Sequence, residues 1–366
     1  MKSILYLSLI DWNYIMQRPQ HIANELSKSY EVDYIYEKSV LKWLLEQKNK
    51  NKAENHKHDH LHLKRVLVQP FGRFKKIDHL NIRIVKSLVT DLLARKEYEM
   101  IWATHPKYID TIPAAYKGKI VYDCMDYHAG FYEEPKKRSE IESQEKRLTQ
   151  AADVVFTSSP LLYQRILSYS AKENVYFVPN AADSAHFMQA RSQKSGSRTT
   201  VGYFGAISYW FDFDLLEKLA EQFPDLEFQM IGPIEVAGIV KRFSRFPNVK
   251  FLGEVSFKVL PIYLKEFDVC IMPFKKNDLI EAVDPVKIYE YLAGGKPVVS
   301  VYYEGLERFS DYIYTASNFA EFSAQLIKAL EEDCSRLTEK RISFVSENTW
   351  AERALVMQKQ ISKTFS

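Results

Sequence analysis

Short runs of β-branched and aromatic residues alternate with helical segments along the whole chain, and this alternation restricts the fold more than any other feature of the sequence. The runs read as strands because they are short, apolar and bounded by turn residues. They lie at residues 2–10, 31–37, 65–69, 99–104, 119–124, 153–158, 174–179, 200–205, 226–232, 249–253, 268–274 and 296–302. Alternation of this kind predicts an α/β fold with parallel sheets and helical crossovers.

One polar stretch, residues 189–200, interrupts the alternation and has no apolar periodicity. A chain of 366 residues exceeds a usual single core, so this stretch is the best candidate for a linker between domains. We predict two doubly wound, Rossmann-like domains that face a cleft. The first covers residues 1–188 and is joined by a C-terminal helix, 349–366, that crosses back to it; the second covers residues 198–348.

The composition is that of a folded globular protein, with 46% hydrophobic and 27% charged residues. The three cysteines are widely spaced and show no metal-ligand spacing, which favours free thiols in a reducing compartment. No apolar run reaches the roughly 20 residues that span a bilayer. Residues 4–10 lack a following cleavage site, so we interpret them as a strand rather than a signal peptide. These observations predict a cytoplasmic protein.

The net charge of +3 is unevenly distributed, because residues 40–90 hold 12 Lys and Arg against 4 Asp and Glu. The simplest interpretation is a solvated polar loop. Aromatic and leucine residues in the same segment also fit a surface that rests on anionic lipid at the inner face of the cell membrane. We expect no nucleic-acid partner. Four alternating histidines at 56–62 leave metal binding by this segment open, although an incidental cluster is the simpler reading.

Ligands of doubly wound sheets bind beyond the carboxyl ends of the strands, so the residues that follow each strand are the candidates for a site. No G-x-G-x-x-G follows either leading strand, and the chain has no G-x-x-x-x-G-K-[ST]. The sequence therefore does not support a nicotinamide dehydrogenase or a P-loop nucleotide hydrolase.

Residues 283–299 predict a short helix whose first turn holds a lysine. Asp284 is expected to be the N-cap, Pro285 the first helical residue and Gly294 the stop. Lys287 then lies against the positive end of the helix dipole, a position that a bound diphosphate would make favourable. Glu290 lies one turn deeper on the same face, where its carboxylate could accept hydrogen bonds from a ribose diol. The alternative is an exposed, weak lysine–glutamate pair.

Several segments, in this order, resemble GT-B glycosyltransferases of the large bacterial capsule, exopolysaccharide and cell-wall family, particularly the teichuronic-acid-type and xanthan glucuronosyltransferase-like members. The resemblance covers nearly the whole chain. The segments are QRPQHIANELSK, VYDCMDYHAGF, VPNAADSAHF, VGYFGAISYWFDFDLL, FQMIGP, VKFLGEV, DVCIMPF and DPVKIYEYLAGGKPVV.

The resemblance implies the GT-B fold and a donor site in the second domain for a UDP-, dTDP- or GDP-sugar. The expected donor-binding residues are Gly205, Ile231, Gly232, Pro233, Phe274, Lys287, Ile288 and Glu290. The family normally needs no divalent metal, and none is expected here. Two departures stand out. Ala282 occupies the position of the first glutamate of the family's Glu-x7-Glu, with Glu281 one position off, and the loop after the first donor-domain strand lacks the usual Arg or Lys.

An inverting transferase needs a general base for the acceptor hydroxyl. Asp126, just past the strand at 119–124, is the first candidate, because the xanthan-type members that this sequence resembles use an aspartate of the first domain. A turn or capping role for Asp126 is the alternative. His105 is the second candidate, with a structural histidine as its alternative. We predict transfer of a hexose-type sugar to a hydroxyl of a glycan, carried on a polyprenyl diphosphate. A GT-B sugar-nucleotide 2-epimerase and a non-catalytic glycan-assembly partner remain alternatives, and stereochemistry stays open.

Overall fold

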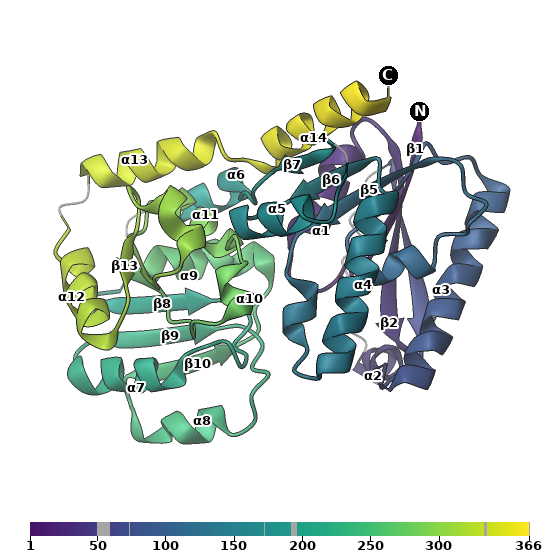
Figure 1. The fold of residues 1–366 in the computed structure, drawn as a ribbon. Helices are drawn as coiled ribbons and strands as arrows, with labels where there is room; N and C mark the ends of the chain where they lie inside the picture. The colour runs from purple at the N-terminus through teal and green to yellow at the C-terminus, as the bar shows by residue number, and fades with distance from the viewer. Residues whose placement is uncertain (50–58, 73, 172, 192–195, 333–334, 366) are drawn as a thin grey trace. The chain divides into compact units, whose positions relative to one another are not determined.

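The computed structural model describes residues 1–49, 59–72, 74–171, 173–191, 196–332 and 335–365 (Figure 1). Packing of its elements divides the chain into two compact units. The first consists of Met1–Pro179 together with Arg353–Ser366, and the second of Asn180–Glu352. Each unit is built around its own parallel sheet.

The first unit contains a seven-stranded sheet in the order β3-β2-β1-β4-β5-β6-β7, with every neighbouring pair parallel. The order reverses between β1 and β4, which is the doubly wound arrangement. The strands are β1 (Ser3–Ser8), β2 (Glu31–Ser39), β3 (Leu61–Val68), β4 (Met100–Ala103), β5 (Lys119–Cys124), β6 (Val154–Thr157) and β7 (Val175–Phe177).

Helices connect these strands, and several begin at the signals that the sequence carries. Pro135 and Pro160 are the first residues of α4 and α5, where the missing proline N–H is not needed. Ser159 caps α5 by accepting a hydrogen bond from the Leu162 N–H at 3.3 Å. The helices are α1 (Arg18–Leu26), α2 (Val40–Asn49), α3 (Lys75–Arg95), α4 (Pro135–Ala151), α5 (Pro160–Leu167) and α14 (Trp350–Phe365), which begins in the second unit. The 3₁₀ turns are η1 (Pro106–Asp110) and η2 (His128–Phe131).

A buried ion pair joins α1 to the first sheet. Arg18 and Asp123 are 2% and 0% exposed, and Nη2 of Arg18 lies 2.8 Å from Oδ1 of Asp123. Nη1 of Arg18 also donates to the carbonyl oxygen of Val178 at 2.8 Å. A buried guanidinium is tolerated because these acceptors replace the hydrogen bonds that water supplies. The pair fixes the start of α1 to β5 and to the chain that follows β7.

The second unit repeats the doubly wound order in a six-stranded parallel sheet, β10-β9-β8-β11-β12-β13. Its strands are β8 (Thr200–Phe204), β9 (Glu227–Ile231), β10 (Val249–Gly253), β11 (Val269–Met272), β12 (Val298–Val301) and β13 (Tyr314–Ala316). Strand β13 was not predicted. The prediction of two Rossmann-like domains is confirmed.

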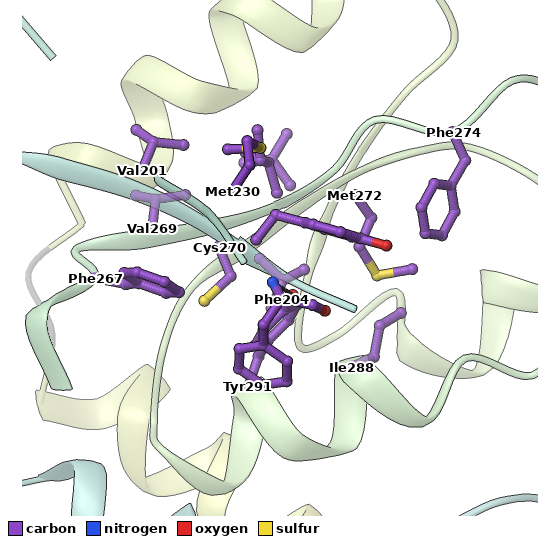
Figure 2. Packing of buried hydrophobic residues seen from close by; sticks show 14 of the residues in the cluster. Val201, Phe204, Met230, Phe267, Val269, Cys270, Met272, Phe274, Ile288 and Tyr291 are labelled. Carbon is purple, nitrogen blue, oxygen red and sulfur yellow. Dashed lines mark hydrogen bonds between the residues drawn. The ribbon is translucent and has the colours of Figure 1, made fainter. Parts of the chain in front are cut away.

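The helices of the second unit pack their apolar faces on this sheet. Figure 2 shows Ile288 and Tyr291 pointing from α11 toward Phe204, Met272 and other buried residues of the strands. The hydroxyl group of Tyr291 accepts a hydrogen bond from the Phe204 N–H at 3.0 Å, which fixes α11 to the end of β8. The helices are α6 (Ser184–Phe187), α7 (Phe213–Gln222), α8 (Ile239–Arg242), α9 (Leu260–Glu266), α10 (Asp278–Glu281), α11 (Val286–Ala293), α12 (Phe319–Leu330) and α13 (Ser335–Ser346). The 3₁₀ turns are η3 (Met188–Arg191), η4 (Phe243–Arg245), η5 (Phe257–Val259) and η6 (Glu304–Phe309).

Among all the residues that the structure describes, no helix is both long enough and apolar enough to cross a bilayer.

Candidate functional site

The order of the second sheet reverses between β8 and β11, and two glycines shape the backbone beside that point. Gly205 follows β8 and Gly232 follows β9, with φ values of +139° and +137° that side chains disfavour. A Cβ on Gly232 would lie 2.0 Å from the carbonyl oxygen of Gly205. The N–H of Gly205 donates to the Ile231 carbonyl at 2.8 Å. The two loops therefore pack backbone against backbone, where only glycine fits.

Lys287 lies directly against this backbone. A Cβ on Gly205 would be 1.8 Å from Cε of Lys287. The ammonium group lies 5.8 Å from the ring centroid of Tyr203, in cation–π contact. It forms no hydrogen bond or ion pair with any of the residues that the structure describes. Burial lowers the pKa of Lys287, an effect that nearby Glu290 opposes.

Glu290 is the second ionisable group at this point and is 6% exposed. Its carboxylate also has no hydrogen-bond or ion-pair partner in the described part of the chain. Burial raises the pKa of Glu290, Lys287 acts in the opposite direction, and Asp183 raises it further. Buried charges without partners cost several kcal/mol, so proteins seldom retain them without a ligand to bind. Lys287 and Glu290 thus form an unsatisfied pair of opposite charge.

The start of α11 differs from the prediction. The helix begins at Val286 rather than Pro285, and Pro285 occupies the N-cap position, where it supplies no capping side chain. The prediction of Asp284 as the cap was wrong, because its carboxylate accepts a hydrogen bond from the Asn180 N–H at 2.6 Å instead. The first turn of α11 therefore has no side-chain cap. An anion could take that place, with Lys287 as its counter-charge.

The other donor-site candidates divide into backbone and core residues. Ile231, Phe274 and Ile288 are 1%, 5% and 0% exposed and belong to the hydrophobic core, so their side chains support the site rather than line it. Figure 2 labels Phe274 and Ile288 among these packed residues. Pro233 is partly exposed, and its carbonyl oxygen accepts a hydrogen bond from Ile207 N–H at 2.9 Å. The structure brings Gly205, Gly232, Lys287 and Glu290 together and sets the three apolar residues behind them.

Asp126 lies in the first unit, two residues after the end of β5. Its side chain is partly exposed, and its carboxylate has no hydrogen-bond or ion-pair partner among the described residues. Desolvation raises the pKa of Asp126 to about 7; Arg18 lowers it and Asp123 raises it. A carboxylate that is available, partly accessible and basic near neutral pH has the properties of a general base.

His105 is held differently. It is 4% exposed, and its Nδ1 accepts a hydrogen bond from the Lys107 N–H at 3.1 Å, so it caps the 3₁₀ turn η1. Its ring lies 4.4 Å from that of His128, centroid to centroid. Burial, with the neighbouring His128, lowers the pKa of His105 well below its usual value. A neutral histidine with one nitrogen engaged in a cap fits the structural role better than the catalytic one.

No group of three or more His, Cys, Asp or Glu side chains among the described residues could hold a metal ion. In the histidine-rich segment, His56 and His58 lie outside the residues that the structure describes. His60 and His62 both contact the Glu31 carboxylate, at 2.9 and 2.8 Å.

Comparison with known proteins bears on the second unit first. Residues 199–332 match the family described as Glycosyl transferases group 1. These residues are similar to the group 1 glycosyltransferases, and we call residues 199–332 the group 1 domain after that match. Over 247 residues the chain is 31% identical to TuaH of Bacillus subtilis, which is described as a teichuronic acid biosynthesis glycosyltransferase. That match covers 63% of this chain and 62% of TuaH, so it spans less than two thirds of this relative.

Solved structures extend the comparison to both units. Anabaena HepE, solved in complex with UDP and glucose, has a TM-score of 0.69 at 15% identity, over 99% of this chain and 98% of its own. Sucrose-phosphate synthase from Thermosynechococcus elongatus has a TM-score of 0.79 at 15% identity, over 100% and 99%. At such identity the likeness shows the fold alone. It confirms the prediction of the GT-B fold.

The group 1 domain differs from the family pattern in the segment before α11 and in the loop after β8. Ala282, at the position of the first family glutamate, is fully buried, and Glu281 accepts a hydrogen bond from the Glu304 N–H at 3.3 Å. The loop after β8 presents Tyr209, 48% exposed, and the adjacent Trp210 in place of a cation. Lys287 is therefore the cation that this part of the group 1 domain directs at Gly205.

One contributor to the group 1 site was not predicted. Tyr203 lies under the Lys287 ammonium group and donates its hydroxyl hydrogen to the Ala206 carbonyl at 2.8 Å. Its place in β8, two residues before Gly205, could have indicated this role, because alternate side chains of a strand share one face.

Proposed function

We propose that this protein transfers a sugar from a nucleoside diphosphate sugar to a hydroxyl group of a glycan or lipid-linked glycan in the synthesis of a surface polysaccharide. The observation that carries the proposal is a pair of opposite charges without partners among the described residues: partly buried Lys287, which lies against Gly205, and buried Glu290. Lys287 would bind the diphosphate together with the first turn of α11, and Glu290 would accept hydrogen bonds from the ribose hydroxyls. Both groups would gain the partners that they lack among the described residues.

The rest of the reaction follows from this assignment. Positive charge from Lys287 and from the N-terminal end of α11 would stabilise the leaving diphosphate, so the proposal includes no divalent metal. Asp126 would remove the proton of the acceptor hydroxyl as that oxygen attacks the anomeric carbon of the donor sugar. The bond between the sugar and the diphosphate breaks as the new glycosidic bond forms. The nucleoside diphosphate leaves with the electron pair of the broken bond.

A thermal-shift screen with UDP, dTDP and GDP tests donor binding. One of these should raise the melting temperature by about 5–10 °C at 100 times its Kd, because binding at that ratio adds about 2.7 kcal/mol to stability. The matching nucleoside, which lacks the diphosphate, is the control and should give little shift. A protein that responds equally to nucleoside and nucleoside diphosphate would contradict the role of Lys287.

Transfer is then tested with the sugar form of the responding nucleotide. Release of the nucleoside diphosphate that requires a glycan acceptor supports the transferase. Interconversion of the donor sugar without any acceptor would instead indicate the 2-epimerase alternative. Donor binding with neither reaction would indicate a non-catalytic glycan-assembly partner.

The proposal places the protein at the inner face of the cell membrane through a basic apolar patch of the first unit. The patch comprises Leu41, Leu44, Leu45, Phe71 and Phe74 with Lys42, Lys75 and Lys76. The five apolar side chains are 47–59% exposed. Leu41 and Phe71 follow the carboxyl ends of the paired strands β2 and β3, so they lie at the same edge of the sheet. Phe71 has a φ of 63°, an uncommon conformation for a bulky residue, and its side chain is exposed.

Flotation with liposomes tests the patch. Each lysine near an anionic surface contributes about 1 kcal/mol, so the double change Lys75→Gln and Lys76→Gln should weaken binding to phosphatidylserine vesicles about thirtyfold. Lys136→Gln with Lys146→Gln on α4 is a matched control, because those lysines are exposed on the same unit. Equal flotation of the two double variants would show that the patch does not bind the membrane.

A further inference from the structure

The first of the two peptides that connect the units is held on both sides by hydrogen bonds that each unit makes internally. The chain passes from the first unit to the second between Pro179 and Asn180. On the first side, the carbonyl oxygen of Val178 accepts from Arg18 Nη1 at 2.8 Å. On the second side, the N–H of Asn180 donates to Oδ2 of Asp284 at 2.6 Å. We call Val178, Pro179 and Asn180 the junction.

Asp284 is buried and well satisfied, which makes it a firm anchor for the junction. It is 4% exposed. Besides the N–H of Asn180, its Oδ2 accepts the Tyr289 hydroxyl at 3.1 Å, and Nη1 of Arg308 lies 3.6 Å from Oδ1. The side chain of Asn180 donates in turn to the backbone carbonyl of Asp284 at 2.6 Å. Two short hydrogen bonds between the same two residues leave little freedom for either.

The position of Asp284 in the chain connects this anchor to the site. Asp284 directly precedes Pro285, the N-cap residue of α11, and lies three residues before Lys287. Any shift of the first turn of α11 as a diphosphate binds to it would therefore act on the Asp284 backbone and on the hydrogen bonds to Asn180.

The first unit shows a parallel arrangement. Arg18, which holds Val178, forms its buried ion pair with Asp123. Asp123 is three residues before Asp126, just as Asp284 is three residues before Lys287. Each side of the junction is thus fixed close in sequence to a residue to which the proposed reaction gives a role.

We propose that Asp284 is a positioning residue that ties the junction to the start of α11 and transmits occupation of the diphosphate position to Asn180. The inference rests on the proposed function, because it requires a nucleoside diphosphate at Lys287. It goes beyond that function by giving a task to a carboxylate that does not touch the donor. A purely structural carboxylate would stabilise the fold without responding to nucleotide.

Hydrogen–deuterium exchange of the peptide that contains residues 180–182 measures the proposed coupling. UDP, dTDP and GDP are each added to the whole protein, and the nucleotide that binds should slow exchange at this peptide at least fivefold. In Asp284→Ala the slowing should fall below twofold, while the nucleotide Kd stays within threefold of the original. Turnover with the corresponding nucleotide sugar should drop at least tenfold in kcat, with KM for the donor within threefold.

Asp268→Ala is the matched control. The Asp268 carboxylate also accepts a backbone N–H at 2.6 Å, from Thr200, but it lies at the amino end of the second sheet, opposite the site. It should keep both the slowed exchange and the original kcat. If Asp284→Ala fails to fold, Asn180→Ala tests the other bond of the anchor. It removes the side-chain donor to the Asp284 carbonyl, while the backbone N–H at position 180 still donates to the carboxylate, so it should lose part of the slowed exchange.

Three results would overturn the inference. Retention of full kcat and of nucleotide-dependent slowing in the junction variants would show that the anchor transmits nothing. Equal losses of affinity and turnover would place Asp284 in binding rather than in positioning. A wild-type protein that binds none of the three nucleotides would contradict the donor assignment itself and the coupling with it, which separates that failure from a failure of the coupling alone.

Discussion

Asp126→Asn is expected to lower turnover by a factor of about 100 to 10,000 while nucleoside diphosphate binding remains intact. The range is that of general-base catalysis by a positioned side chain. Asparagine keeps the shape of the side chain but cannot take the proton of the acceptor hydroxyl. Initial rates of transfer and calorimetry with the nucleotide measure the two quantities separately. Asp91→Asn, an exposed aspartate of α3 in the same unit, is the control and should change neither.

The pH dependence gives this prediction a second readout. Desolvation raises the pKa of Asp126 to about 7, and the base must be ionised to act, so wild-type turnover should rise with pH through that value. Between pH 4 and pH 7 the folded protein holds a proton that the unfolded chain has lost, so this group makes stability fall as pH rises through that window. Asp126→Asn should remove both effects. A variant with normal turnover and an unchanged pH profile would show that another group is the base.

Lys287→Met is expected to weaken nucleoside diphosphate binding about 10- to 100-fold. A hydrogen bond to a charged group contributes about 1.5–3 kcal/mol, and each 1.4 kcal/mol changes Kd tenfold. Methionine retains most of the buried aliphatic stem against Gly205 and Tyr203, so the loss would report on the ammonium group. Calorimetry with the nucleotide found by the thermal-shift screen measures the change.

Without nucleotide, the Lys287→Met protein should be no less stable than wild type, since it loses a partly buried charge that has no partner among the described residues. This combination of weaker binding and undiminished stability separates a ligand-binding lysine from a structural one. Lys218→Met on α7, an exposed lysine of the same unit, should leave the Kd unchanged. Unaltered affinity in Lys287→Met would mean that the diphosphate binds elsewhere.

The sequence predicts the repeating pattern of this fold well because strand and helix periods are local properties. It also places Lys287 in the first turn of α11 and Glu290 on the same face, since helical geometry alone fixes that relation. It fails at Asp284, where the local pattern of an Asp before a Pro fits a helix cap. The structure uses the same carboxylate for the N–H of Asn180, 104 residues away in the chain. No local rule could reveal that partner.

The sequence also did not predict that the side chains of Ile231, Phe274 and Ile288 are buried in the core. Helical periodicity indicates this for Ile288 alone. Ile288 and Tyr291 are three residues apart on the face of α11 that meets the sheet, as their apolar character suggests. The lack of partners for Lys287 and Glu290 is a different kind of fact. These two groups lack partners because none of the described segments around them places a polar group within reach. Only the three-dimensional structure shows this.

The contact between Gly205 and Gly232 has a practical consequence for anyone who redesigns this protein for a different sugar. A side chain at Gly232 would collide with the backbone of Gly205, and one at Gly205 would collide with Lys287. Saturation mutagenesis of either position would therefore yield mostly misfolded or inactive clones. The adjacent loop offers more freedom, because Tyr209 is 48% exposed. A directed-evolution library should therefore vary Tyr209 and its neighbour Trp210 and keep both glycines constant.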